Sequence, residues 1–580
     1  FKILKELMHR TDISEVVNAC DAGREGELIF RFVYEVAGCK KPMRRLWISS
    51  MEESAIREGF NNLKDGREYD NLYNSALCRA KADWIIGINA TRLFTSLYRK
   101  HLNIGRVQTP TLAMIAERDS KISMFRKEKY YTVEIDGGNI KAVSDKISDK
   151  DEAQNLQAAC HERQAVCISA VKEKKKTGAP KLFDLTTLQR EANRIFGYTA
   201  KQTLDYAQSL YEKKLITYPR TDSRYLTDDM HNTVIKIVHI ASKFAPFSNC
   251  TDFKPDTFCL FNNEKVSDHH AIIPTAEIEN ISLAEIPNGE SNILHLIMCK
   301  LLCAVNSPYE YETITAVLEC GGVQFTAKGK IILFEGWKNI EQLFKRYIHS
   351  DTDRAEDVFC ITKGETVTVS SEVKEGYTSP PKAFTEDTLL SSMETAGAAE
   401  TTDEAERKGL GTPATRAAII EKLVQTGFVE RKGKSIVATH NGISLVSVLP
   451  EKLTSPILTS DWENNLAEIA KGNYPPEQFM KGIEDLTREL VTTYSFITDE
   501  DRAIFRAPRE VIGICPRCGS DVHESKNNFY CANKSCKFVM WKNDRFFTSK
   551  RKEITKKMAS DLLAKGRTKV KGLYSEKKDK

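Results

Sequence analysis

The order of hydrophobic and polar residues near the start of the chain predicts a strand, a loop and a helix in succession. Residues 14 to 38 read SEVVNACDAGREGELIFRFVYEVAG. An apolar run from Val16 to Cys20 precedes an acidic, glycine-containing turn, after which apolar residues recur at helical spacing. This order is typical of a parallel α/β unit, in which functional groups gather at the carboxyl end of a strand.

Further along, helical and strand-like patterns alternate over longer stretches. Residues 51 to 125 are mostly helical, and β-like runs follow until the charged sequence EKKKTGAPK, which indicates a linker near residue 181. A helical stretch comes next, and strand-like sequence returns between residues 309 and 377. The pattern therefore predicts one β-rich domain that is interrupted by a helical one.

Two helical regions carry boundary signals. Residues 184 to 214 predict two helices separated by Gly197, and Thr199 to Gln202 fit a capping box at the start of the second. Later, Thr412-Pro413 supplies an N-cap and a first-turn proline, and FVERKGKSIVAT predicts a hairpin after the helix. A helix followed by such a wing is common among nucleic-acid-binding proteins.

Composition and length lead us to expect a large cytosolic protein of several domains. It has 580 residues, 41% hydrophobic and 28% charged, and its mean hydropathy is -0.40. Length alone predicts roughly three to five domains, and no apolar run reaches membrane-spanning length. Of its 15 cysteines, 11 are scattered, which favours a reducing compartment over a disulfide framework.

The net charge of +5 is unevenly distributed. Residues 544 to 580 contain 13 Lys/Arg and 5 Asp/Glu, a local charge of +8, so the rest of the chain carries -3. Such a basic tail favours a polyanion such as nucleic acid, but a tail that only aids solubility fits the charge equally well.

Asp21, Glu25 and Glu27 gather in the first strand-to-helix loop, together with Arg24. Carboxylates at a strand end can hold Mg²⁺, which prefers oxygen ligands. Acidic residues are also favoured at a helix N-terminus by the macrodipole, without any metal. The spacing leaves both interpretations open.

The segment LITYPRTDSRYL, residues 215 to 226, contains a candidate nucleophile. Tyr218 can form a covalent intermediate, although its phenol is a weak nucleophile at its ordinary pKa. Arg220 would lie on the same side of an extended backbone and could stabilise charge on a phosphodiester. A tyrosine in a core or turn is the commoner use of the residue.

Two further segments have both a functional and a structural interpretation. His269, in SDHHAIIPT, can bind a phosphate or assist proton transfer, but a histidine beside an apolar run is more often structural. HLNIGRVQTPTL, residues 101 to 112, offers backbone amides and Arg106 to a phosphate backbone, or forms a tight turn between helices.

Four late cysteines form the strongest local signal. Cys515 and Cys518, then Cys531 and Cys536, give two thiolate pairs at spacings that suit a tetrahedral Zn²⁺ site. Aromatic and basic residues alternate around them, as in sites that stack single-stranded nucleic acid and contact its phosphates.

Taken together, these motifs resemble those of the type IA DNA topoisomerases, most closely the bacterial topoisomerase III group. The resemblance covers nearly the whole chain. Its motifs, in order, are DAGREGELIFR, RAKADWIIGINATRLFT, GRVQTPTL, LITYPRTDS, DHHAIIPT, GLGTPATRAAIIEKL and the four cysteines.

The resemblance implies a multidomain protein of the α/β plus α+β class: a toroid with a partial Toprim α/β unit and winged-helix-like segments, followed by a C-terminal zinc ribbon. The expected boundaries are a partial Toprim domain at 1–50, a discontinuous helical DNA-binding domain at 51–123 and 381–505, a discontinuous β-rich arch at 124–183 and 309–380, a helical domain that bears the nucleophile at 184–308, a zinc ribbon at 510–543, and a basic tail at 544–580 that begins a further module.

Site residues follow by matching motif positions. The resemblance implies catalysis by Tyr218, Arg220, Glu25 and His269, a Mg²⁺ site made from Asp21, Glu25 and Glu27, and a Zn²⁺ site made from Cys515, Cys518, Cys531 and Cys536. It implies that DNA is positioned by Asp83, Arg92, Asn103, Ile104, Gly105, Arg106, Val107, Gln108, Arg220 and Arg416.

Two departures from the family pattern affect the expected acidic site. Toprim motifs commonly read Asp-x-Asp-x-Glu, but the middle position here is Gly23, which leaves Asp21 as the best single Mg²⁺ ligand. The family's glutamate on the first Toprim strand would lie upstream of Phe1. We therefore expect a chain that is incomplete at both ends.

The expected activity is transient cleavage of one DNA strand through a 5′-phosphotyrosyl link, strand passage and religation. It would relax negative supercoils and decatenate DNA without ATP, and no Gly-x4-Gly-Lys-Ser/Thr phosphate loop is present. The expected partners are single-stranded or negatively supercoiled DNA and a helicase or single-strand-binding protein, for a monomer in the bacterial cytoplasm near the nucleoid. The alternative is a non-catalytic fragment that binds single-stranded DNA.

Overall fold

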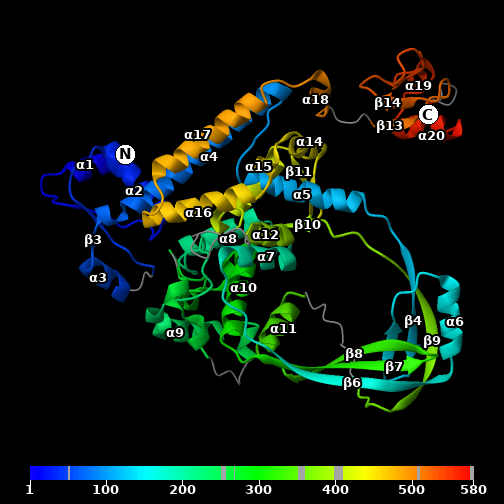
Figure 1. Ribbon diagram of the computed structural model, residues 1–580, viewed down its shortest axis with the longest axis horizontal. Helices are drawn as coiled ribbons and strands as arrows, with labels where there is room; N and C mark the ends of the chain where they lie inside the picture. The colour runs from blue at the N-terminus through cyan, green and yellow to red at the C-terminus, as the bar shows by residue number, and fades with distance from the viewer. Residues whose placement is uncertain are drawn as a thin grey trace. The chain divides into compact units, whose positions relative to one another are not determined.

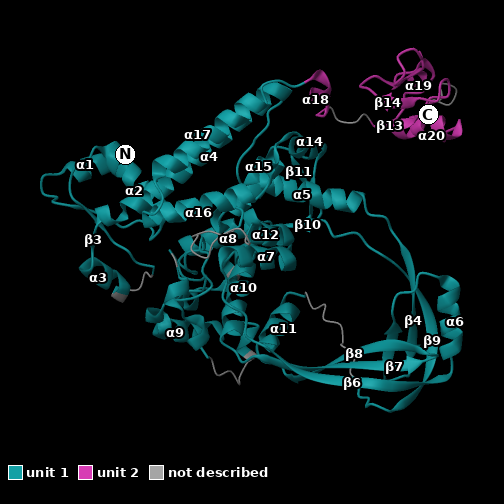
Figure 2. Cartoon of the chain, viewed as in Figure 1, with its two compact units in different colours: residues 1–497 teal, residues 498–580 magenta. Residues whose placement is uncertain are grey.

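The computed structural model describes residues 1–49, 53–249, 256–266, 268–349, 359–397, 409–505 and 510–574. The chain divides into two compact units, Phe1–Ile497 and Thr498–Lys580, called unit 1 and unit 2 below (Figures 1 and 2). Each is described by itself. Among the described residues, no helix combines the length and the apolar composition that crossing a membrane requires.

Unit 1 begins with a small α/β layer, as the hydrophobic pattern predicts. β1 (Val16–Asn18) pairs in parallel with β2 (Met43–Arg45), which pairs antiparallel with β3 (Lys64–Asp65). α2 (Arg24–Ala37) follows β1, so the acidic loop lies at the carboxyl end of that strand. The other helices of this part are α1 (Lys2–His9), α3 (Glu53–Asn61) and the 3-10 helix η1 (Gly66–Tyr69).

Three long helices bring distant parts of unit 1 together. α16 (Ile457–Lys471) and α17 (Pro476–Thr493) pack along α4 (Asp70–Tyr98), although they come almost 400 residues later in the chain (Figure 1). Small residues permit this close approach, and the hydroxyl of Ser75 donates to the carbonyl of Leu466 at 2.7 Å. A loop then connects α4 to α5 (Gln108–Ser123).

The two helices predicted around Gly197 are confirmed. α7 (Leu185–Phe196) ends at Gly197, whose φ of 73° is left-handed, and α8 (Ala200–Glu212) opens with a capping box of Thr199 and Gln202. Their apolar faces join one large core. The core is completed by α9 (His231–Ala241), α10 (Asn288–Ala304), α11 (Trp337–Tyr347) and short 3-10 helices at Asp228–Met230, Phe247–Asn249, Phe258–Leu260, Asn263–Lys265, Ala276–Asn280 and Leu283–Glu285.

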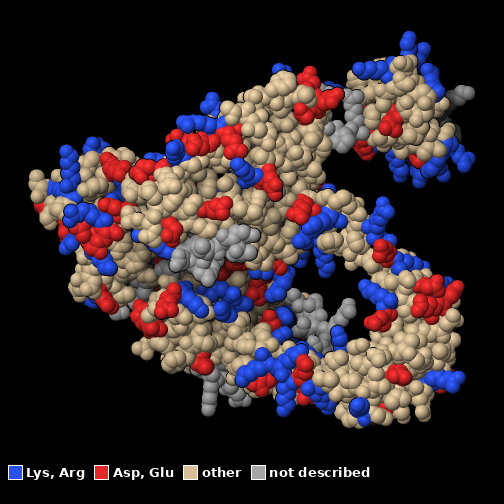
Figure 3. All heavy atoms as spheres, in the orientation of Figure 1, with Lys and Arg blue, Asp and Glu red and all other residues tan. Residues whose placement is uncertain are grey.

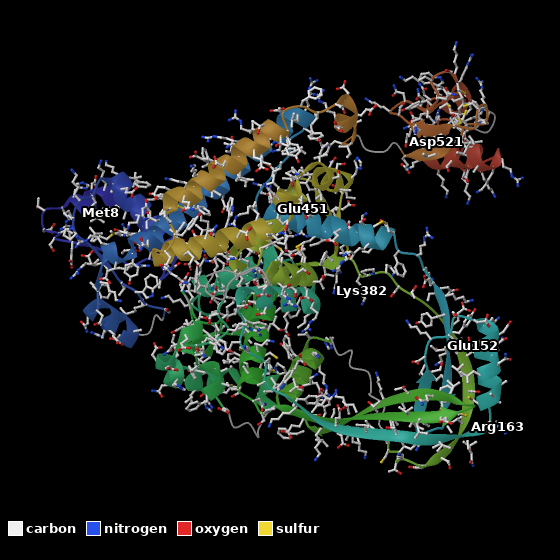
Figure 4. All side chains as sticks on the ribbon, viewed as in Figure 1. Met8, Glu152, Arg163, Lys382, Glu451 and Asp521 are labelled. Atoms are coloured by element: carbon white, nitrogen blue, oxygen red, sulfur yellow. The ribbon has the colours of Figure 1, made fainter. Side chains whose placement is uncertain are left out.

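Six strands from two separate stretches of the chain close into a barrel. Their order around it is β4-β5-β8-β7-β6-β9. The bounds are β4 (Lys129–Asp136), β5 (Lys141–Ser144), β6 (Arg163–Thr177), β7 (Tyr309–Cys320), β8 (Val323–Phe334) and β9 (Thr366–Tyr377). Glu152, on α6 (Lys150–Cys160), and Arg163, at the start of β6, lie at the barrel end (Figure 4). From there β6 and β7 run back towards α10 and α11 (Figure 1).

The predicted helix and wing are also confirmed. Thr412 forms a capping box with Thr415 at the start of α13 (Pro413–Gln425), and β11 (Val429–Lys432) pairs antiparallel with β12 (Ser435–Ala438). The neighbouring elements are β10 (Phe384–Thr385), α12 (Glu386–Thr395), α14 (His440–Val448) and α15 (Glu451–Thr454).

Unit 2 is built on a four-stranded antiparallel sheet. Its strands are β13 (Val511–Ile514), β14 (Asp521–Glu524), β15 (Asn528–Cys531) and β16 (Val539–Trp541). Part of the basic tail folds onto this sheet, because Met558 and Ala559 of α20 (Lys556–Lys565) are buried in its core. Gly513 permits this contact, since a Cβ there would lie 2.7 Å from that of Leu563. Two short helices, α18 (Asp499–Ala503) and α19 (Arg545–Ser549), complete the unit.

Gly26, in the first turn of α2, packs closely against the acidic loop, and a substitution there can test this packing. A Cβ on Gly26 would collide with the backbone of Asp21, which cannot move away as a side chain could. We expect Gly26→Ala to lower the free energy of unfolding of unit 1 by about 1 to 3 kcal/mol, measured by denaturant titration. The matched control is Gly482→Ala in α17, where no atom lies within 4 Å of the new Cβ and the change should be neutral or stabilising. Equal effects of the two substitutions would contradict the tight turn.

Candidate active site and cysteine cluster

The segment around Tyr218 is held against the segment that follows Asp268. The amide of Thr217 donates to the carbonyl of Ile273 at 2.9 Å, and the hydroxyl of Thr221 donates to the carbonyl of His269 at 2.8 Å. Tyr218 therefore lies in a loop fixed on both sides, rather than in a regular strand. Sequence spacing alone could not have paired these two segments.

This pairing places the ring of His269 on the ring of Tyr218. Their centroids are 4.4 Å apart, and Tyr211 packs on another side of Tyr218 at 5.2 Å. Partial burial raises the pKa of the Tyr218 phenol; Arg220 opposes this shift, and Asp21 adds to it. The phenol is therefore protonated at neutral pH, so attack by its oxygen requires a proton acceptor and compensation of negative charge.

Asp21 reaches the same place from the acidic loop. Its Oδ1 lies 3.5 Å from Nε2 of His269, and the imidazole lowers the pKa of the Asp21 carboxyl. That nitrogen is buried, and beyond this contact it has no hydrogen-bond partner among the described residues. The structure thus brings together three residues that sequence reasoning had proposed separately: Asp21, Tyr218 and His269. Arg220, two residues after the tyrosine, is exposed.

The other two acidic candidates are differently engaged. Glu25 is half-exposed, and its carboxylate lies 2.6 Å from Arg79. Glu27 is fully buried, and its oxygens bind Asn18, Arg31 and Arg45 at 2.8 to 3.1 Å. Glu27 therefore faces the interior of the α/β layer and does not join Asp21.

A buried charge cluster connects the acidic loop to the long helices. Glu463 of α16 lies 2.9 Å from Arg24, 3.3 Å from Arg106 and 3.6 Å from Arg79. Burial opposes ionisation of Glu463, but these arginines outweigh it and lower the pKa to about 2. Sequence reasoning noted Arg24 only as a neighbour of the acidic residues and missed Glu463 and Arg79, because a glutamate on an amphipathic helix carries no local sign of distant arginines.

The segment from Asn103 to Gln108 is fixed to α4. Thr91 binds the amide of Ile104 at 3.0 Å, and Arg106 Nε lies 2.7 Å from Asp83. The amide of Gly105, expected to be offered to a phosphate, donates instead to the hydroxyl of Thr109 at 3.1 Å. Asn103, Val107 and Gln108 are half-buried, and Ile104 is buried.

The two remaining DNA-binding candidates have opposite surroundings. Arg92 on α4 is exposed. Arg416 is 3% exposed, and its guanidinium donates to the hydroxyl of Thr186 at 2.8 Å and to the carbonyl of Leu410 at 3.2 Å. Burial lowers the pKa of Arg416, against the influence of nearby carboxylates that include Asp222. Its charge therefore lies close enough to interact with Asp222, in the segment that contains Tyr218.

Basic side chains gather along the strands that lead from the barrel. On the face shown in Figure 3, Lys and Arg side chains cluster over the stems of β6 to β8. By accessibility, Lys172, Lys174, Lys175 and Lys176 of β6 are exposed. Such a stripe suits a nucleic-acid backbone.

In unit 2 the four cysteines converge. Cys515 Sγ lies 3.7 Å from Cys536 Sγ, Cys518 Sγ lies 3.4 Å from Cys531 Sγ, and all four lie within 4.8 Å of one another. Four thiolates around a tetrahedral Zn²⁺ lie about 3.8 Å apart, given bonds of about 2.3 Å. The cluster can therefore hold a metal ion.

Comparisons with known proteins agree with this geometry. A family model described as DNA topoisomerase matches residues 67–481. DNA topoisomerase 3 of Bacillus subtilis is 39% identical over 540 residues, which are 90% of this chain and 73% of that protein. DNA topoisomerase 3 of Bacillus cereus is 38% identical over 561 residues, 92% of this chain and 76% of that protein.

A solved structure extends the likeness to the fold. Full-length topoisomerase I from Thermotoga maritima matches with a TM-score of 0.67 at 22% sequence identity, over 93% of this chain and 87% of that one. Its fold, like this one, combines helices and sheets. The chain belongs to the type IA DNA topoisomerase family. It is thus an isomerase that acts on DNA, as the motif order predicted.

The charge cluster makes a prediction about stability and pH. Glu463→Gln removes the buried carboxylate shared by Arg24, Arg106 and the partly buried Arg79, and it should lower the free energy of unfolding of unit 1 by about 3 to 5 kcal/mol at neutral pH. The folded pKa is near 2, whereas an unperturbed glutamate titrates near about 4.3. The ionised form therefore adds stability above about pH 4.3 that is lost as the pH falls towards 2.

Denaturant titrations from neutral to acidic pH measure this difference. The gap between the wild type and Glu463→Gln should be full at neutral pH and should narrow below about pH 4.3. Glu468→Gln, which removes an exposed carboxylate from the same helix, is the matched control and should leave stability nearly unchanged. A gap that is independent of pH would refute the assignment.

Proposed function

We propose that Tyr218 is the nucleophile that cleaves one DNA strand. The observation that carries this proposal is the meeting of Tyr218, His269 and Asp21 from three segments that are distant in sequence. The phenol gives up its proton to a neighbouring acceptor or water, its oxygen attacks the scissile phosphorus and forms a 5′-phosphotyrosyl bond, and the P–O3′ bond breaks as the 3′ oxygen leaves and takes up a proton. Religation reverses the step: the 3′ hydroxyl attacks phosphorus and the phenol leaves. One phosphodiester replaces another, so no ATP is needed.

The neighbouring groups have distinct roles in this proposal. Arg220 supplies positive charge where it develops on the phosphoryl oxygens. His269 orients the tyrosine ring and presents Nε2 as a partner for a phosphate or a transferred proton. Arg416 is buried near Asp222, in the segment that contains Tyr218, and adds positive electrostatic potential to the site.

The acidic loop fits a Mg²⁺ site, because Asp21 presents a half-exposed carboxylate beside the unpartnered nitrogen of His269. Asp21 would hold the ion, with Glu25 contributing once it turns from Arg79. The ion, when bound, would neutralise charge on the DNA phosphates. The surroundings of Glu27 favour a structural role, since its carboxylate is already shared by two arginines.

We further propose that the chain binds single-stranded or negatively supercoiled DNA, relaxes or decatenates it, and works as a monomer in the cytoplasm near the nucleoid. Asp83, Arg92, Arg106 and the Asn103–Gln108 segment would position the strand, and the six expected domains would have the boundaries given above. A zinc ribbon in unit 2 would add contacts to single-stranded DNA. A binding-only fragment is less favoured, because the chain spans about three quarters of its relatives.

The first test removes the nucleophile. Tyr218→Phe keeps the ring and its packing but lacks the attacking oxygen, so relaxation of negatively supercoiled DNA should fall by about a thousandfold or more. Denaturation on a labelled single-stranded oligonucleotide should leave a covalent adduct with the wild type and none with the variant. Tyr225→Phe, in the same segment, is the matched control and should retain the adduct. Unchanged activity in Tyr218→Phe would refute the proposal.

The second test concerns the metal in unit 2. Cys531→Ser should reduce bound zinc from one ion per chain to none and should unfold unit 2, because a metal-organised site stabilises the fold that it closes. Zinc content and scanning calorimetry measure both effects, and the transition of unit 1 should be unchanged. Cys360→Ser removes an exposed cysteine of unit 1 and serves as control. A unit 2 transition that resists both Cys531→Ser and chelation would exclude a structural metal.

A further inference from the structure

A carboxylate from another part of the chain lies where Gly23 has no side chain. A Cβ built on Gly23 would lie 2.5 Å from both carboxylate oxygens of Asp268. Gly23 is buried, and its φ of -161° is ordinary extended backbone, so the glycine is not required by conformation. A side chain at this position would instead collide with the Asp268 carboxylate, which occupies that space.

The same carboxylate is close to the proposed Mg²⁺ ligand. The amide of Gly23 donates to the carbonyl of Asp21 at 2.8 Å, so these two residues form one tight turn. Asp268 immediately precedes His269, whose Nε2 lies 3.5 Å from Oδ1 of Asp21 and is buried without a hydrogen-bond partner. The two carboxylates, Asp21 in the acidic loop and Asp268 from the other segment, therefore both lie against the turn that Asp21 and Gly23 form.

We propose that Asp268 supplies the second carboxylate of the Mg²⁺ site, in place of a side chain at Gly23. Mg²⁺ is usually bound through one or two carboxylates and completes its shell with water and phosphate oxygens. Two acids from different segments satisfy this requirement as well as two from one loop. The inference rests on the proposed Mg²⁺ site and names a ligand that the sequence motif does not contain.

One consequence concerns the position of the nucleophile. Residues 271 to 275 are hydrogen-bonded to the segment of Tyr218, through Thr217 and Ile273. An ion held by Asp21 and Asp268 therefore joins the acidic loop of the α/β layer to the segment that fixes the tyrosine. Metal binding and the placement of Tyr218 become coupled, which no ligand set confined to the acidic loop would achieve.

A simpler role for Asp268 is to cap α2, since a carboxylate is favoured at a helix N-terminus. The two roles differ in what asparagine can do. Asn is nearly as good a cap as Asp, but it lacks the charge that a Mg²⁺ ligand needs. Asp268→Asn therefore keeps the capping oxygen and removes only the metal-binding charge.

The experiment is calorimetric titration of the full chain with Mg²⁺ alone. Asp268→Asn should weaken Mg²⁺ binding by at least about tenfold while the melting temperature without metal stays unchanged. Glu264→Gln, which removes an exposed carboxylate from the same segment, should bind like the wild type. Gly23→Asp alone should destabilise the protein, because the new side chain meets a like charge at contact distance.

The exchange variant Gly23→Asp/Asp268→Ala gives the most decisive comparison. It moves the carboxylate from one segment to the other and should restore Mg²⁺ affinity to near the wild-type value. Binding by Asp268→Asn that equals the wild type, an exchange variant that folds but fails to restore affinity, or a wild type that binds no Mg²⁺ would each overturn the inference. If the exchange variant does not fold, Asp268→Asn against Glu264→Gln decides.

This result can be separated from the test of Tyr218. Titration with Mg²⁺ needs neither DNA nor cleavage, so its failure leaves the covalent adduct and the nucleophile assignment untouched. Conversely, if no covalent adduct forms through Tyr218, the titration still measures the difference in Mg²⁺ affinity between Asp268→Asn and Glu264→Gln.

Discussion

The arrangement of the active site depends on the buried carboxylate of Glu463 and the three arginines around it. Arg24 opens the helix that follows the acidic loop, Arg79 lies on α4, and Arg106 belongs to the loop before α5. One charge in α16 thus sets the distance between three elements. Because an isolated buried charge is costly, Glu463 needs these arginines, and the contact with Arg24 holds the start of α2, and with it the acidic loop, against α16.

The second constraint is the backbone pairing of the segments around Tyr218 and His269. Neither segment is a regular strand, yet each satisfies hydrogen-bonding groups of the other. This irregular pairing holds the ring of His269 against that of Tyr218, and Asp21 of the acidic loop meets His269 there.

Local structure was largely predictable from the sequence. The strand, loop and helix at the acidic motif, the helices around Gly197 and the wing after α13 all formed as the patterns predicted. The motif order also indicated the family. Contacts between side chains were harder to predict from the sequence. Glu27 looked like a metal ligand, but its carboxylate binds arginines inside the α/β layer. The amide of Gly105 donates to the hydroxyl of Thr109.

The sequence by itself determined the elements, the family, the nucleophile candidate and the four cysteines, because periodicity, caps and thiolate spacing are properties of short stretches of chain. Only the tertiary structure decided which charges meet. Glu463 lies hundreds of residues from its arginines, and Asp268 lies 245 residues from Gly23, the glycine whose missing side chain makes room for it. Such contacts depend on long-range packing, which no local pattern encodes.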